Sequence, residues 1–365
     1  MFSPPLLPRT LEAAKRDLAS AKPEVRASAI RDLVRHASSE ASVRKDAVTA
    51  FARMLSEDVS PPVRAEAAVA LADLDGHEAH AALLVAIEDE SAHVREMALA
   101  ALGEIGDERA APRLRRALAD DRPEVRYQAL IAFTRVRKDA PDDVADALLA
   151  ALDDGDDAIR HIALRIAEEW ITAKRPLPVR ALAERARRLL DDPSPDVALA
   201  AAIVLAETGD AAGRAHVLRV VMADRIVPGA VTPGREDERA AVELAGALGL
   251  REAIPALERR AYGLGRFVRD TCAWHAKIAL ARMDHPRAIA EFRRDLASKN
   301  RETREAAVVA VGRARVRALA ADVAALAPGS VDATLLDEAR RMLSEITPMA
   351  APEPERPERT EEGSR

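Results

Sequence analysis

The stretch TCAWHAK, from Thr271 to Lys277, gathers the residue types in this chain that are best suited to chemistry. It holds the only cysteine, Cys272, with Trp274 and His275 within four positions. A thiol beside an imidazole is how some nucleophiles are built, and Cys and His are also zinc ligands. Either use needs further groups placed nearby, so the surroundings of the stretch decide whether it is a reactive centre.

The rest of the sequence carries no motif that would complete such a centre. The eight histidines are scattered, and only His77 and His80 have the i, i+3 spacing of neighbours on one helix face. There is no P-loop, no G-x-G-x-x-G after a strand, no G-x-S-x-G and no H-E-x-x-H. The sequence therefore predicts a protein that is not an enzyme, without catalytic residues, cofactor or metal.

The composition favours a helical chain. Hydrophobic residues make up 48% of the 365 residues but aromatic residues only 2%, so the core must consist mostly of Ala, Leu, Val and Ile. A net charge of −6 gives no general attraction to nucleic acid or anionic lipid. The start has no leader pattern and no apolar run is long enough to span a membrane, so a cytoplasmic location is expected.

A repeat runs through most of the chain. Val94-Arg95 recurs 31 residues later as Val125-Arg126, within segments that match in their apolar spacing. The same frame occurs in PEVRASAIRDL, PPVRAEAAVALADL, DAIRHIALRIAEEW and RFVRDTCAWHAKIAL. A period of about 30 to 40 residues built from two amphipathic helices indicates an α-solenoid.

Each repeat begins with one helix, turns at an Asp-rich step and continues into a second helix that opens with Pro or a capping residue. The second helices are predicted to start near Lys22, Ser60, Ser91, Arg122, Gly155, Ser194, Arg235, Gly265, Asn300 and Ser330. We therefore expect an all-α fold, a right-handed α-solenoid of about ten antiparallel helix pairs over residues 1–346. A loop insertion near 224–237 contains two Pro-Gly pairs, and residues 347–365 form a Pro/Glu/Arg-rich tail that is expected to be disordered.

The pattern D-x-(x)-P-x-V-R-x-x-A-x-x-A-L-G-x-I-G-D, as it stands at Asp89 to Asp107, resembles HEAT repeats, particularly the short bacterial HEAT-like or phycobilin-lyase-type repeats. The resemblance extends from about Pro8 to about Ile346 and implies the fold, whereas such repeats serve many unrelated functions. The chain also resembles HEAT-like alkylpurine DNA glycosylases, which offer an alternative. This alternative is supported by Trp274, Asp270 and the many arginines. The acidic balance and scarce aromatics speak against it, and no chromophore site of a phycobilin lyase can be located.

An arginine recurs directly after the Val or Ile that we count as position 0 of each second helix. It lies in the first helical turn, where the helix dipole disfavours a cation, so it needs an acidic partner. We predict a structural ladder between stacked repeats, formed by Arg26, Arg64, Arg95, Arg126, Arg160 and Arg269 with Asp58, Asp89, Asp120 and Asp153. The alternative, a row of arginines that binds phosphate, is disfavoured because each arginine has an acid nearby. The ladder lapses where Ala198 replaces the arginine.

At about 100° per residue, positions 0, 4, 7, 8 and 11 face the core. Cys272 and His275 then occupy small core positions, so the thiol should be buried and inert, and the histidine marks either a polar contact or a looser joint. Trp170 is also predicted to be core. Positions 2, 6 and 9 face away, toward the concave groove that the HEAT resemblance implies. The residues predicted to contact a partner there are Tyr127, Ile131, His161, Arg165, Asp270, Trp274 and Lys277.

These observations favour a non-catalytic scaffold or adaptor that binds a partner protein in its concave groove. A nucleic-acid-binding protein of the alkylpurine DNA glycosylase type is the alternative. Neither the partner, nor its pathway, nor the oligomeric state is specified by the residues. The role of the loop near 224–237, either a tolerated insertion or a partner contact, also stays open.

The small residues at position 4 should let neighbouring helices approach closely. Replacing Ala129 with Leu is therefore expected to overpack the stack and to lower the free energy of unfolding by about 1–3 kcal/mol. Thermal unfolding followed by circular dichroism measures the effect. An unchanged melting temperature for Ala129→Leu would contradict the predicted register.

Overall fold

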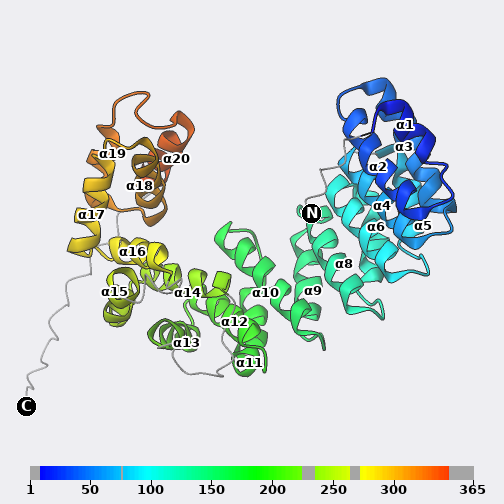
Figure 1. Cartoon of the computed structure of the whole chain (residues 1–365). Coiled ribbons are helices and arrows are strands. Elements are labelled where there is room, and N and C mark those ends of the chain that lie inside the picture. The colour runs from blue at the N-terminus through cyan, green and yellow to red at the C-terminus, as the bar shows by residue number, and fades with distance from the viewer. Residues whose placement is uncertain (1–8, 75–76, 224–234, 264–271, 345–365) are drawn as a thin grey trace, which may run out of the picture. The chain divides into compact units, whose positions relative to one another are not determined.

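The computed structural model describes residues 9–74, 77–223, 235–263 and 272–344, and within these ranges the chain consists of α-helices, short 3₁₀ turns and connections (Figure 1). The predicted all-α fold is confirmed. Among the described residues, no helix has both the length and the apolar character needed to span a membrane. The described residues divide into two compact units, one that ends at residue 216 and one that begins at residue 217, here called the N-terminal and C-terminal units.

The N-terminal unit contains six pairs of consecutive helices. They are α1 (Leu11–Asp17) and α2 (Pro23–Ala37), α3 (Ala41–Glu57) and α4 (Pro61–Asp73), α5 (His80–Ala86) and α6 (Ala92–Ile105), α7 (Ala111–Ala117) and α8 (Pro123–Val136), α9 (Pro141–Ala151) and α10 (Asp157–Thr172), and α11 (Val179–Arg188) and α12 (Pro195–Glu207). The second helices α2, α4, α6 and α8 lie side by side, each packed on the next (Figure 1).

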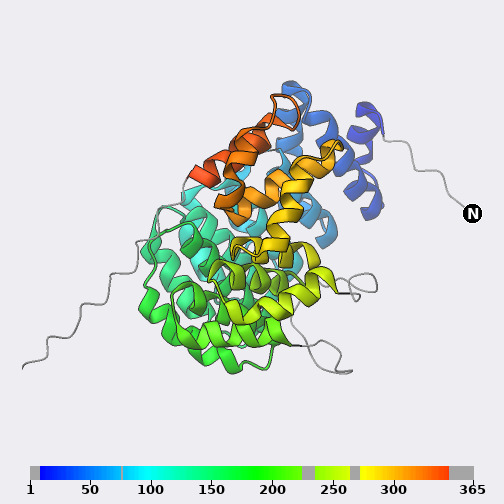
Figure 2. The same cartoon turned by 90° about the vertical axis from the view of Figure 1, so that its left-hand side faces the viewer.

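The unit boundary falls within α13 (Ala211–Met222), which precedes α14 (Arg235–Ala247). The pairs that follow are α15 (Ile254–Tyr262) and α16 (Ala273–Arg282), α17 (Pro286–Leu296) and α18 (Arg301–Ala314), and α19 (Ala320–Ala324) and α20 (Ala333–Ser344). The view turned by 90° shows the same succession of helices along the chain (Figure 2). Six pairs precede α13 and three follow α14, so the twenty α-helices of the described residues agree with the predicted number of about ten pairs.

The predicted starts of the second helices hold to within three residues for all but one of them. Proline in the first helical turn marks several of these starts, because the missing amide hydrogen has no partner there in any case. The exception is the helix predicted to start near Gly265, since α16 starts only at Ala273. Cys272 is its N-cap residue, in a left-handed conformation with φ of 56°, and is 3% exposed. The thiol is therefore buried as predicted, but it does not lie on the helix.

Several predictions fall outside the described residues. They concern Arg269, Asp270, residues 224–234 of the predicted loop and the tail at 347–365. The last three residues of the predicted loop, 235–237, are helical, because α14 begins at Arg235.

Three pairs of neighbouring second helices are in close contact where a glycine at position 9 of one helix meets an alanine of the next. A side chain on the glycine would collide with the backbone of that alanine, so only glycine permits this spacing. If each glycine carried a Cβ atom, that atom would lie too close to the Cα atom of the facing alanine. The distances would be 2.9 Å for Gly103 and Ala132, 2.5 Å for Gly246 and Ala279, and 2.9 Å for Gly312 and Ala339.

Position 9 therefore packs against the next second helix, and the prediction that it is an outward-facing, exposed position is wrong. Thr134, which occupies this position in α8, is only 6% exposed. A helical wheel that assumes one buried side overestimates the exposure of these residues. A second helix packs on the first helix of its own repeat and also on the second helices of the preceding and following repeats. The Gly246 contact also shows that Ala279 is equivalent to Ala132, so α16 is displaced by one turn from the register counted from Val268.

A ladder of Arg–Asp ion pairs connects consecutive repeats of the N-terminal unit. In each pair the guanidinium donates two hydrogen bonds to one carboxylate, a geometry that fixes both side chains. The side chains are largely buried, with exposed fractions of 5–19%. The pairs are Arg26–Asp58 (2.6 Å), Arg64–Asp89 (2.7 Å), Arg95–Asp120 (2.8 Å), Arg126–Asp154 (2.8 Å) and Arg160–Asp192 (2.9 Å).

Each internal aspartate of the ladder is held by two arginines. Arg64 of one repeat binds the Asp89 carboxylate of the next, and Arg95 donates to the Asp89 backbone carbonyl at 3.1 Å. The carboxylate also accepts a hydrogen bond from the backbone N–H of Ser91 at 2.9 Å, and this bond closes the turn before α6. The same three contacts recur in the following repeats, so the ladder is continuous from Arg26 to Asp192.

The prediction that Asp153 belongs to the ladder is wrong, because the neighbouring Asp154 takes that place. The ladder acid always lies five residues before position 0, where its carboxylate can accept the turn amide, and in this repeat Asp154 has that spacing to Ile159. Asp153, one residue too early, instead pairs with Arg185 and Arg188 of α11.

The sequence pattern did not reveal one equivalent arginine in the C-terminal unit. Arg304 donates to the carbonyl of Ser298, six residues earlier, as every ladder arginine does, and binds the Ser330 carbonyl at 2.6 Å where an aspartate would be expected. The pattern fails here because Thr303, not Val, precedes the arginine.

At the start of α14 the charges are reversed. Glu238, 2% exposed, occupies the arginine position when Gly246 is aligned with Gly103, and accepts from Arg260 of α15 at 2.6 Å. The Cys272 Sγ lies 3.7 Å from the other carboxylate oxygen of Glu238. The lone cysteine is therefore buried against a paired carboxylate in this unit.

Removing one ladder carboxylate should destabilise the protein, because it leaves a largely buried guanidinium without its partner. Asp120→Asn is expected to lower the free energy of unfolding by about 1–3 kcal/mol. Burial raises the pKa of Asp120, but the hydrogen bonds from Arg95 and the Arg122 amide outweigh burial, so its pKa lies below the usual 3.8. The stabilisation by the ionised carboxylate is thus complete above pH 4 or so and is lost as the pH falls through the lowered pKa.

Denaturant titrations between pH 3 and pH 7 measure this effect. The matched control is Asp121→Asn, because Asp121 also touches Arg95 but is 82% exposed. Equal losses of stability for the two variants would contradict a structural role of the ladder.

Candidate functional site

The second helices α6, α8 and α10 of the N-terminal unit line a groove of about 770 Å³, which we call the α8–α10 groove. Its apolar floor comes from Ile131 on α8 and from Ile162, Ile166 and Trp170 on α10. Charged side chains surround the floor. They are Glu104, Arg135, Lys138, Glu169 and Arg175.

The groove exists because the close contact between second helices is interrupted at this point. Between α6 and α8 the contact is Gly103 on Ala132, but the equivalent positions of α8 and α10 are occupied by Thr134 and Ile166. Their larger side chains hold the two helices apart, and α8 packs on α10 much less extensively than on α6. Both residues line the groove. The widened joint therefore follows directly from two substitutions in the repeat pattern.

The end of α10 fixes one wall of the groove. Lys174 adopts a left-handed conformation with φ of 55°, and the Arg175 amide donates back to the Trp170 carbonyl at 2.8 Å. This C-terminal cap places the Arg175 guanidinium 5.0 Å from the centre of the Trp170 ring. Trp170 is 5% exposed and packs in the core as predicted, while it also lines the groove.

The charges around the floor differ in how they are satisfied. Arg135 forms an ion pair with Glu104 across α6 and α8. By contrast, Lys138, Glu169 and Arg175 form no ion pair with any residue that the structure describes. The rim is thus a mixture of one neutralised pair and three charges that face solvent.

Of the predicted partner contacts in this unit, only Ile131 lies in the groove. Tyr127 and His161 are half-buried and do not line it, although they lie on α8 and α10. Arg165 is ion-paired with Glu168 of its own helix. Sequence reasoning missed Ile166 because the wheel places its position 7 in the core. It missed Ile162 because position 3 belongs neither to the core positions nor to the positions that face away. The signal that could have found Ile166 is isoleucine at a position that holds alanine in α4, α6 and α8.

The predicted partner contacts of the C-terminal unit that the structure describes, Trp274 and Lys277, contact other residues of the same unit. Trp274 is 38% exposed and packs edge-to-face on Phe292 of α17, with ring centres 5.9 Å apart. Lys277 is paired with Glu291 at 3.0 Å. Asp270 lies outside the described residues.

His275 forms a polar contact, one of the two alternatives predicted for it, but it is not a core residue. Its Nδ1 lies 2.6 Å from Glu243 Oε1, and the other oxygen of Glu243 is 3.2 Å from Arg313. The histidine side chain is 22% exposed. Because α16 is displaced by one turn, His275 lies near α14 and α18 and bridges second helices through Glu243. The residues of TCAWHAK that the structure describes therefore form no reactive cluster.

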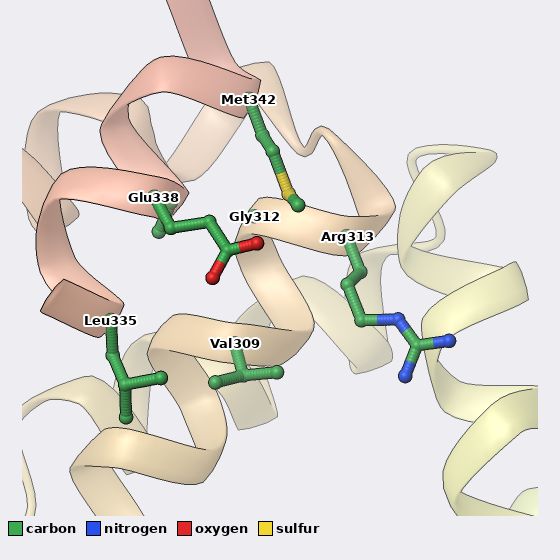
Figure 3. A pocket seen from close by; sticks show the side chains of 7 residues that line it. Val309, Gly312, Arg313, Leu335, Glu338 and Met342 are labelled. Atoms are coloured by element: carbon green, nitrogen blue, oxygen red, sulfur yellow. The ribbon is translucent and has the colours of Figure 1, made fainter. Parts of the chain in front are cut away.

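A smaller pocket of about 260 Å³ lies between α18 and α20 (Figure 3). Val309 and Leu335 form one end, and Met342 and Glu338 extend from α20 over Gly312. Arg313 points away from α20, consistent with its ion pair to Glu243. The pocket is about one third of the volume of the α8–α10 groove.

Residues 48–134 match the family model described as HEAT repeats. The match covers α4 to α8, including the ladder arginines Arg64, Arg95 and Arg126, and the repeats on both sides of it have the same helix pairs. This part of the chain is therefore similar to HEAT repeats. No curated protein matches it at a significant level.

Similar solved structures include an engineered protein, with 19% identity and a TM-score of 0.40, covering 92% of this chain and 98% of that one. The complex of CpcE and CpcF of phycocyanin lyase from Nostoc sp. PCC7120 is 20% identical, with a TM-score of 0.36 and coverage of 79% and 96%. Kap121p bound to Pho4p is 12% identical, with a TM-score of 0.48 and coverage of 90% and 40%. Function must therefore be argued from this chain's own surfaces.

Between α10 and α12, the carboxylates of Glu168 and Glu207 lie near each other. Burial and then the charge of Glu168 raise the pKa of Glu207 to about 7, which a hydrogen bond from Thr172 at 3.5 Å only partly offsets. The folded state thus disfavours ionised Glu207, and the protein should lose stability as the pH rises from about 4.5 to about 7.

Glu207→Gln is expected to remove this loss. The free energy of unfolding of the variant should exceed that of the wild type by an amount that grows between pH 4.5 and pH 7 and is constant above. Glu184→Gln, which removes an exposed carboxylate of α11, provides the reference for a change of one surface charge. A difference between Glu207→Gln and wild type that does not vary with pH would contradict the raised pKa.

Proposed function

We propose that this protein is a non-catalytic scaffold that holds a segment of a partner protein in the α8–α10 groove. The observation that supports the proposal is the groove itself, with its aliphatic floor and charged rim. Its volume of about 770 Å³ is within the range of about 300–1,000 Å³ typical of binding pockets. Apolar anchors within a polar rim are also the usual anatomy of a protein interface.

The frame around the groove supports this use. The ladder pairs Arg95–Asp120, Arg126–Asp154 and Arg160–Asp192 fix the repeats on both sides of it. Trp170 and its cap fix the wall of α10. A preformed groove requires little reorganisation on binding, and this favours affinity from a small contact area.

The alternative of nucleic-acid binding finds less support. A row of arginines could bind phosphates, but each of the five ladder arginines in the N-terminal unit already donates to an aspartate and to a backbone carbonyl. The ring of Trp170, on which a base could stack, is covered by Arg175. We therefore retain protein as the partner class. Tyr127, His161 and Arg165, and Trp274 and Lys277 in the C-terminal unit, remain proposed further contacts.

Placing a charge on the groove floor should abolish partner binding without unfolding the protein. Ile162 is half-buried at the floor, and Ile162→Glu is expected to lose the partners that the wild type retains from a lysate of the source organism. Quantitative mass spectrometry of the retained proteins measures the loss.

The matched control is Val85→Glu, an equally apolar-to-acidic change at a residue of α5 that is 66% exposed and outside the groove. Melting curves of both variants verify that they are folded. Identical sets of retained proteins for wild type and Ile162→Glu would refute the proposed binding site.

A further inference from the structure

The guanidinium of Arg175 is arranged as a receptor for a carboxylate. Its Cζ lies over the indole of Trp170, 5.0 Å from the ring centre, and its backbone is fixed by the hydrogen bond to the Trp170 carbonyl. Its side-chain N–H donors form no hydrogen bond or ion pair with the residues that the structure describes, so they are available. A fixed fork of donors matches the two oxygens of a carboxylate.

Lys138 adds a second cation to the same groove, on the α8 side. Neither Lys138 nor Arg175 has an ion-pair partner among the residues that the structure describes, whereas Arg135 is neutralised by Glu104. Glu169 is the one lining carboxylate left without such a pair among those residues. The lining therefore carries three cations and two acids, in a chain whose net charge is −6. The groove is locally opposite in sign to the protein as a whole.

The cations lie beside an aliphatic floor. Ile131, Ile162 and Ile166 contribute branched side chains that bind apolar groups by burial, and none of them can bind a charge. A ligand that satisfies both parts must combine aliphatic side chains with carboxylates. Phosphate groups would satisfy the cations alone and would leave the isoleucines exposed.

From this combination we infer that the α8–α10 groove selects an acidic amphipathic protein segment, with aliphatic side chains on the isoleucine floor and an Asp or Glu on Arg175 and Lys138. The inference rests on the proposed function and specifies the chemistry of the partner. It makes Arg175 and Lys138 the residues that determine specificity, while the isoleucines supply most of the buried area.

Selection from a phage-displayed library of random 16-residue peptides tests this inference. The immobilised proteins are the wild type, Ile162→Glu, and the double charge reversal Lys138→Glu/Arg175→Glu. The control for overall charge is Lys45→Glu/Arg180→Glu, which reverses two exposed cations of the same unit outside the groove. Binding of synthetic copies of selected peptides is then measured by fluorescence anisotropy at two salt concentrations.

Peptides recovered on the wild type but not on Ile162→Glu are expected to combine aliphatic residues with Asp or Glu. They should bind Lys138→Glu/Arg175→Glu about tenfold more weakly or worse, corresponding to about 1.4 kcal/mol, and bind the control double variant as well as the wild type. The charge-reversed groove should select peptides with Lys or Arg instead.

The outcomes separate the two proposals. Groove-dependent peptides without acidic residues, or with undiminished binding to the charge-reversed protein, would overturn the inference and leave the scaffold proposal standing. Recovery of the same peptides on wild type and Ile162→Glu, or of none on either, would overturn both. Displacement of bound peptide by a DNA duplex at physiological salt would show that the cations serve phosphate, and would also overturn the inference.

Discussion

The N-terminal unit depends on one repeated interaction, the bidentate pair between an arginine at the start of one second helix and an aspartate in the turn before the next. Each internal aspartate uses its carboxylate for one repeat and its carbonyl for the following one. Such a pair fixes the register between neighbouring repeats, because a shift of one residue between them would leave a largely buried guanidinium without its acid. The ladder thus sets the stagger between repeats, while the alanine-rich core sets only their distance.

Within that frame, small variations in the helix contacts have large effects. Where Gly103 meets Ala132 the helices touch, and where Thr134 and Ile166 take the equivalent positions a groove opens. The same two side chains that separate the helices then line the groove. A binding surface can therefore arise in a repeat protein without an insertion or a new element, through two larger residues at an inter-repeat contact.

The sequence predicts the periodic part of this structure well and its exceptions poorly. The Pro-marked helix starts and the Arg26, Arg64 and Arg95 pairs repeat often enough to define the pattern. Asp154, in contrast, lies beside an equally acidic Asp153, and only the spacing to the helix distinguishes them. Of the groove isoleucines the sequence pattern predicts only Ile131, because a helical wheel does not show which side of a second helix meets the next repeat. The late start of α16 coincides with a left-handed backbone conformation at Cys272. Glycine commonly marks such a conformation in a sequence, and here the residue is a cysteine.

The ladder also determines how the chain can fold. Its five pairs join residues only 25 to 32 positions apart, so each repeat is coupled to its immediate neighbour and to nothing distant. In such an array folding spreads from one repeat to the next, and the strength of each junction decides how far cooperativity extends. The N-terminal repeats, linked by five successive pairs, should behave as one cooperative block. At Ala198 this coupling lapses, so repeats beyond that point can open locally while the groove within the block keeps its shape.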